Sequence, residues 1–182
     1  MGNIKIITKE LFIGEYINQE SVGKTIEKIT EINLEDDEIR RLYGDKCKIK
    51  PISLFINSYG GSVYDGFALI NALLNSTTPV NTICIGSAMS MAFIIFLCGK
   101  VKIMGQYSTL MYHECSQFVW DKLEGVKLKI EEAGRLQAMM DHIVISNSKI
   151  TQDELNDIKK RKAEWYIDII EANRLGLMDR GI

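Results

Sequence analysis

Two buried-strand patterns in the chain each run, through a turn of small residues, directly into a helical pattern. The first strand is ISLFIN at residues 52–57, which a glycine turn joins to a helix-patterned segment at 62–76. The second is VNTICIG at 80–86, which a second small-residue turn joins to a short apolar helix at 91–98. Strands connected by crossover helices are the repeating unit of α/β domains with largely parallel sheets. The sequence therefore predicts an α/β fold.

The remaining segments extend this pattern without a repeat or a linker, so we expect the 182 residues to form a single domain. Residues 34–48, LEDDEIRRLYGDKCK, are strongly charged and are predicted to form a surface excursion. Thr151 with Glu154, and Asp168 with Glu171, have the spacing of capping boxes that open helices. Further strands are predicted at 11–16, 101–104 and 110–114, and further helices at 18–33, 121–145 and 151–160.

The composition argues against several classes of partner. The formal net charge is −2, which gives no basis for binding nucleic acid. The longest apolar run, Ala92 to Cys98, is far too short to span a membrane. Cys84 and Cys98 lie in apolar runs and are predicted to be buried free thiols, which favours a reducing, cytoplasmic location. Neither of the two histidines lies at ligand spacing from a cysteine, so no zinc site is predicted.

The two strand-to-helix junctions contain the residues suited to chemistry. In FINSYGGSVYDGF, the adjacent glycines either form a tight turn that needs positive φ or present a bare backbone N–H to a ligand. In CIGSAMSMAF, Ser90 is predicted to lie at a helix start, as an N-cap or as a nucleophile. Ser87, after Gly86, is predicted to be a turn residue that bonds to local backbone. Neither serine lies in a G-x-S-x-G motif.

Acyl transfer requires a hydroxyl, a base, an orienting acid and two N–H donors for the oxyanion. Ser90 can supply the hydroxyl, and the backbone N–H groups of Gly61 and Met91 can supply the donors. His113 is predicted at the end of a strand, where a sheet edge can present it as the base. His142 lies inside the long amphipathic helix and is predicted to pack or to be solvated there.

Three segments in this order, FINSYGGSVYDGFALINALL, TICIGSAMSMAFIIFLCG and LMYHE, resemble motifs of the Clp protease proteolytic subunit family, ClpP. That family has a glycine turn of the form S-P-G-G, a nucleophilic serine before a methionine, and a histidine in M-x-H. Gly61 precedes Ser90 by 29 residues and His113 follows it by 23, close to the family's spacing. The ending EWYIDIIEANRLGLMD also resembles the family's closing motif, so the resemblance covers about residues 10–180.

The resemblance implies a fold, a site and an assembly. The fold is a spiral of ββα units, as in crotonases, with a protruding handle helix that matches residues 121–145. Ser90 matches the nucleophile, His113 the general base, and the N–H groups of Gly61 and Met91 the oxyanion hole. The family forms seven-membered rings, usually stacked in pairs, and it cleaves peptides or unfolded proteins that an ATP-dependent unfoldase delivers. Peptide cleavage itself needs no cofactor.

The sequence also departs from the family pattern. The position of the triad acid holds Glu164 where the family has aspartate; a glutamate can orient a histidine, and otherwise Glu164 is a surface carboxylate, with Asp168 the next candidate. Tyr59 replaces the proline of the glycine turn. Residues 1–10 are short compared with the family's axial loop, and residues 34–48 look inserted. These last two features resemble ClpP-like proteases of phages and leave open the pairing with a standard unfoldase.

Three functions therefore remain as hypotheses. The first is a serine endopeptidase that works inside a ring-shaped oligomer, which the intact Ser90 and His113 favour. The second is a catalytically silent ring subunit with a structural or regulatory role. The third is a crotonase-type acyl-CoA enzyme, which would direct the same two N–H donors at a thioester enolate and would need no serine–histidine pair.

Overall fold

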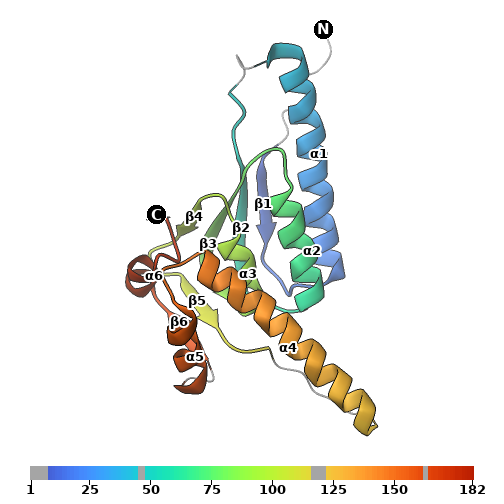
Figure 1. The fold of residues 1–182 in the computed structure, drawn as a ribbon. Coiled ribbons are helices and arrows are strands. Elements are labelled where there is room, and N and C mark those ends of the chain that lie inside the picture. The colour runs from blue at the N-terminus through green and yellow to red at the C-terminus, as the bar shows by residue number, and fades with distance from the viewer. Residues whose placement is uncertain (1–7, 45–47, 116–121, 162–163) are drawn as a thin grey trace.

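The computed structural model describes residues 8–44, 48–115, 122–161 and 164–182, and these residues form an α/β domain around a seven-stranded sheet (Figure 1). The short segment predicted at 1–10 lies mostly outside the described residues. The elements in chain order are β1 (Glu10–Ile13), α1 (Gln19–Tyr43), β2 (Ile52–Ser58), α2 (Val63–Leu74), β3 (Val80–Met89), α3 (Met91–Leu97), β4 (Lys102–Met104), β5 (Thr109–Tyr112), α4 (Leu123–Ser146), α5 (Gln152–Arg161), β6 (Trp165–Ile167), α6 (Ile169–Leu175) and β7 (Arg180–Gly181).

The sheet is parallel apart from one pair of strands. Its main path runs β1-β2-β3-β4-β7, and β5 pairs with β3 and, in the antiparallel sense, with β6. β3 changes partner along its length, because residues 82–84 pair with β4 and residues 87–89 pair with β5. The prediction of an α/β fold with a largely parallel sheet is confirmed.

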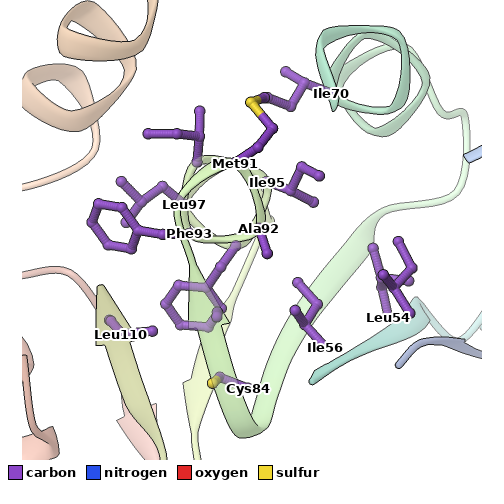
Figure 2. Close-up of a cluster of buried hydrophobic side chains, with 14 of the residues drawn as sticks. Leu54, Ile56, Ile70, Cys84, Met91, Ala92, Phe93, Ile95, Leu97 and Leu110 are labelled. Atoms are coloured by element: carbon purple, nitrogen blue, oxygen red, sulfur yellow. The ribbon is translucent and has the colours of Figure 1, made fainter. Parts of the chain in front are cut away.

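The core lies between the sheet and the helices α1, α2 and α3. All seven side chains of α3 are buried. Figure 2 shows this helix nearly end-on, enclosed by side chains that include Ile70 of α2, Leu54 and Ile56 of β2, and Leu110 of β5. Gly66 of α2 permits this packing, since a Cβ there would lie 2.3 Å from the Met91 side chain. The burial fixes the position of the residue that precedes α3, Ser90.

The helix α1 begins where predicted but does not end at residue 33. Asn18 caps its first turn in a capping box with Ser21, and the helix then continues to Tyr43. Residues 34–43 lie mostly on the surface, as predicted, but they continue α1 and do not form a separate excursion. Residues 45–47 lie outside the described part of the chain, and an insertion relative to the family stays a prediction. The helix continues because Asp36 lies on the same buried face as Ile29 and Ile32.

A buried ion pair joins this extension of α1 to the start of the sheet. The Asp36 carboxylate accepts hydrogen bonds from Lys9 Nζ at 2.7 and 2.8 Å and from the Thr78 hydroxyl at 2.5 Å. The Asp36 side chain is only 2% exposed. A buried carboxylate is tolerated when it is paired and hydrogen-bonded in this way.

The long helix α4 has two unlike halves. Its buried residues are confined to the C-terminal half, at Leu136, Met140, Asp141 and Val144. Its N-terminal half projects away from the body of the domain (Figure 1), as expected for a handle helix. No helix within the described ranges has the length and apolar character required to cross a membrane.

Candidate active site

The carboxyl ends of three neighbouring parallel strands converge on one pocket. The glycine turn follows β2, Ser90 follows β3, and His113 follows β5. The pocket has a volume of about 250 Å³, and its lining includes Gly61, Ser90 and His113. The structure thus brings together three of the residues that sequence analysis selected, although Gly61 and His113 are 52 positions apart.

Ser90 occupies a strained junction between β3 and α3. Its φ of +53° with ψ of −125° makes it the single non-glycine residue with positive φ in the described ranges. Such a conformation costs about 1–3 kcal/mol and is held by surrounding structure. The Ser90 N–H donates to the Met111 carbonyl of β5 at 2.8 Å, which ties the junction to the neighbouring strand. Strained strand-to-helix turns of this kind expose a nucleophilic hydroxyl.

The Ser90 hydroxyl is not used as a helix cap. Although Ser90 occupies the N-cap position of α3, its side chain makes no capping hydrogen bond. Across the described residues, no hydrogen bond joins this hydroxyl to His113 either. Catalytic hydrogen bonds are often long in unliganded enzymes and tighten when substrate binds. The side chain is thus available for chemistry.

The glycine turn lies directly against this junction. Gly60 has φ of +101°, and a Cβ there would lie 2.7 Å from the Met89 carbonyl oxygen and from the Ser90 Cβ. Gly61 has φ of +151° and pairs with Ile17 through the Gly60 carbonyl and the Ser62 N–H, which leaves the Gly61 N–H out of the pairing. The glycines therefore form the positive-φ turn considered from the sequence and also allow a close approach to the Ser90 junction. The presentation of a backbone N–H to a ligand stays a prediction.

Ser87 does not lie in a turn, so that prediction is wrong. It lies within β3, and both its N–H and its hydroxyl donate to the Asn57 Oδ1, at 3.0 and 3.2 Å. Gly86 allows the approach, because a Cβ there would lie 2.5 Å from that same oxygen. The strand continues through Gly86 because β5 replaces β4 as its partner. Ser87 is a buried residue that the sheet satisfies.

A backbone carbonyl orients the imidazole of His113. Its Nδ1 lies 2.6 Å from the Glu114 carbonyl oxygen, and a carbonyl oxygen only accepts, so Nδ1 is the donor of this hydrogen bond. In a neutral imidazole, Nε2 is then the nitrogen that can accept a proton. His142, by contrast, is exposed on α4.

A thiol shares the pocket with the two polar side chains. Cys115 lines the same space as Ser90 and His113. Burial raises the pKa of the Cys115 thiol, so the thiol remains protonated at neutral pH. Cys115 is thus a poor nucleophile in comparison with a thiolate. Cys84 is a buried free thiol, as predicted, whereas Cys98 is only partly buried.

The predicted acid, Glu164, does not line the pocket. Its side chain is exposed, and its carboxylate accepts a hydrogen bond from the Tyr166 hydroxyl at 2.7 Å. β5 and β6 pair Tyr112 with Trp165. His113 and Glu164 are the next residues along this antiparallel register, one step beyond the paired strands.

Asp168, the alternative acid, has a structural role. Its Oδ1 accepts a hydrogen bond from the Glu171 N–H at 2.8 Å and caps α6, as the sequence spacing predicted. The predicted capping box at the start of α5 is confirmed in full, since Thr151 and Glu154 bond reciprocally there.

A hydroxyl at a strained junction, a proton-accepting imidazole and adjacent backbone N–H groups are the components of a serine hydrolase site. Comparison with known proteins gives the family. A sequence model of the Clp protease family matches residues 8–182. The ATP-dependent Clp protease proteolytic subunit 2 of Synechococcus sp. (strain CC9605) is 26% identical over 171 residues, which cover 93% of this chain and 80% of the relative. The corresponding subunit of Deinococcus radiodurans is 24% identical over 174 residues, which cover 94% and 79%. The chain belongs to the Clp protease family, and the protein is a serine-type peptidase.

The glycine turn supplies the first testable prediction. Gly60→Ala introduces a Cβ that overlaps the Ser90 Cβ and the Met89 carbonyl oxygen, so the junction must move. A displacement of about 1 Å at a catalytic group costs roughly 10²-fold in rate. We expect a loss of this size in kcat for a fluorogenic peptide. The matched control is Gly14→Ala, where an added Cβ meets nothing within 4 Å. Near-native turnover by Gly60→Ala would show that the turn does not constrain the nucleophile.

Proposed function

We propose that the protein is an endopeptidase that cleaves peptides or unfolded polypeptides through an acyl-enzyme on Ser90. The observation that carries the proposal is the single pocket lined by Ser90, His113 and Gly61. The other two functions considered from the sequence do not account for a strained serine, free of capping bonds, beside a histidine with an open Nε2.

The first half of the reaction forms the acyl-enzyme. Ser90 Oγ attacks the scissile carbonyl carbon while His113 Nε2 takes the hydroxyl proton. The carbonyl oxygen becomes an oxyanion, which the N–H groups of Gly61 and Met91 stabilise. Met91 is the first residue of α3, where the N–H has no intrahelical acceptor. When the tetrahedral intermediate collapses, the C–N bond breaks and His113 gives its proton to the leaving amine.

The second half of the reaction releases the acid product. Water attacks the ester carbon of the acyl-enzyme, and His113 Nε2 takes a proton from the water. The second tetrahedral intermediate collapses, the bond to Ser90 Oγ breaks, and His113 returns the proton to Oγ. No metal or organic cofactor takes part in this sequence of steps.

The nucleophile is tested with a fluorophosphonate probe and a peptide substrate. Ser90→Ala is expected to remove probe labelling and to lower peptide cleavage by about 10⁶-fold, as loss of a nucleophile does in other serine peptidases. Intact-mass analysis should place a single adduct on Ser90 in the wild-type protein. Ser87→Ala is the control, because it removes only the 3.2 Å bond to Asn57 and should keep most activity. Equal losses from both variants would refute the assignment, and an unlabelled wild-type protein would favour the catalytically silent subunit.

Glu164 is proposed as the acid that orients His113. The cross-strand register supports this role, because extending the β5–β6 pairing by one residue in the active arrangement opposes His113 and Glu164, and directly opposed residues have Cβ atoms about 4.5–5.5 Å apart. In the active arrangement, Glu164 exchanges the Tyr166 hydroxyl for the Nδ1–H of His113, which releases the Glu114 carbonyl. Asp168 lies beyond Ile167, the residue opposite Leu110, and its carboxylate is occupied as a helix cap.

Substitution at the acid position separates these candidates. Glu164→Gln is expected to lower kcat by about 10⁴-fold, because an amide can hold the wrong histidine tautomer. Glu164→Asp should keep partial activity, and Tyr166→Phe should keep near-native activity because it only frees the carboxylate. Asp168→Ala should chiefly weaken the cap of α6, by about 1 kcal/mol in thermal unfolding, whereas Asp168→Asn should keep the cap, because asparagine caps helices about as well as aspartate. If Asp168→Asn loses turnover while Glu164→Gln retains it, the acid is Asp168.

We further propose that the subunits form a seven-membered ring, stacked in pairs through α4, in the reducing cytoplasm. The projecting half of α4 exposes three large apolar side chains, Leu123, Leu128 and Ile130. Exposed apolar side chains that lie together mark surfaces that bind another protein. Heterologous interfaces that repeat and close give rings. Both relatives are named as subunits of an ATP-dependent protease. These names support the proposal that an unfoldase delivers substrates to such a ring.

Assembly is measured by light scattering at micromolar concentration. The wild-type protein is expected to have the mass of stacked rings. The double variant Leu128→Glu, Ile130→Glu should halve that mass, because it places charge on the apolar surface of α4. Lys127→Glu, which changes a neighbouring polar position on the same helix, is the control and should leave the mass unchanged. A stable monomer in the wild-type protein would contradict the proposal.

A further inference from the structure

A buried polar network includes Tyr112, the residue that precedes His113, and the reaction described above does not use it. At its centre is Asp141, on the inner face of α4, which is 6% exposed. Its Oδ1 accepts hydrogen bonds from the Tyr112 hydroxyl at 2.5 Å and from Gln137 Nε2 at 2.7 Å. Its Oδ2 accepts from Lys159 Nζ of α5 at 2.5 Å. The carboxylate is thus paired with a cation and fully hydrogen-bonded, as burial requires.

This network holds the chain on both sides of the histidine. Tyr112 immediately precedes His113, and its hydroxyl also accepts a hydrogen bond from Gln137 Nε2 at 2.8 Å. Cys115 follows two residues later, and its N–H donates to Gln137 Oε1 at 2.6 Å. Gln137 and Asp141 are four residues apart and lie on one face of α4. Two anchors on one helix face therefore fix the segment that presents the imidazole.

The ring of Tyr112 also contacts the element that carries the nucleophile. It packs edge-on against Phe93, with ring centroids 6.2 Å apart and an interplanar angle of 72°. Phe93 is fully buried in α3, three residues after Ser90. Burial, together with the hydrogen bond to Asp141, raises the pKa of Tyr112, so its hydroxyl stays protonated and donates. Tyr112, the last residue of β5, thus links the strand that leads to His113 with α3, which follows Ser90, and with α4.

We infer that Tyr112 and Asp141 are positioning residues for the peptidase, which set the place of the His113 imidazole relative to the Ser90 hydroxyl. The inference rests on the proposed function of His113 as the general base. Lys159 serves as the counter-charge that makes the buried carboxylate tolerable. The network acts through the histidine and does not itself exchange protons with substrate.

A matched pair of variants tests the inference on the assembled protein. Tyr112→Phe removes the hydroxyl that donates to Asp141, a buried aspartate that also binds Lys159. The variant keeps the aromatic ring against Phe93. Thr78→Val removes the hydroxyl that donates to Asp36, a buried aspartate that also binds Lys9, and neither Thr78 nor Asp36 lines the pocket. Both variants lose the same kind of bond, so both should lower the melting temperature to a similar degree. A merely structural role predicts no further difference between them.

The positioning role predicts a kinetic difference. Tyr112→Phe should lower kcat by roughly 10- to 100-fold, the size expected for a misplaced catalytic group, with KM within about twofold of the wild type. The rate of fluorophosphonate labelling at Ser90 should fall by a similar factor, while the labelled fraction still reaches completion. Thr78→Val should keep the wild-type kcat and labelling rate. Gln137→Met, at a half-buried position, removes the anchor of the Cys115 N–H and should slow both rates in the same way.

The outcomes are distinguishable. If wild-type protein is labelled at Ser90 and both Tyr112→Phe and Gln137→Met keep its rates, the inference is overturned and the proposed function stands. If Thr78→Val slows turnover as much as Tyr112→Phe, the network contributes general stability and the inference is likewise overturned. If wild-type protein is not labelled at all, the proposed function fails and the inference fails with it.

Discussion

The contact between the Gly60 turn and the Ser90 backbone is the constraint on which the site depends. With 2.7 Å between the position of a Gly60 Cβ and the Ser90 Cβ, the two junctions have no room for any side chain between them. Parallel strands put their carboxyl ends at one edge of a sheet, so β2, β3 and β5 bring their following residues together there. The change of partner along β3, from β4 to β5, is what adds the histidine-bearing strand to the group.

Short sequence segments predict the elements of the fold whose formation depends on neighbouring residues. The glycine turn after β2, the short apolar helix and the capping residues Thr151 and Asp168 could be predicted, because burial and caps leave signals within a few residues. The second junction could be predicted only in part, because β3 continues to Met89. The end of α1 was not, since the buried Asp36 depends on Lys9 and Thr78 from other segments. The short strand β6 carries three residues, too few for an alternating pattern to be recognised.

The candidate site likewise contains residues that sequence motifs reveal and residues that only tertiary contacts reveal. Ser90, His113 and Gly61 could be selected from the sequence because each ends or follows a strand with a recognisable motif. Ser87 was misassigned, because only the tertiary contact with Asn57 reveals how its hydroxyl is satisfied. The network around Asp141 was missed altogether, since Tyr112 and Lys159 approach it from segments that lie 29 and 18 residues away. The spacing of Gln137 and Asp141 on one helix face was its only local signal.

The complete burial of α3 has a consequence for how variation near the nucleophile is interpreted. All seven residues after Ser90 are enclosed on every side, so substitutions there create cavities or overlaps that lower the stability of the whole domain. In a cell, a loss of about 1–2 kcal/mol changes the amount of folded protein several-fold. Proteolytic capacity measured in an extract would then fall through the amount of folded enzyme, in addition to any change in turnover that a displaced Ser90 causes. Along this stretch of chain, activity in an extract has to be divided by the amount of folded enzyme before it reports on the nucleophile.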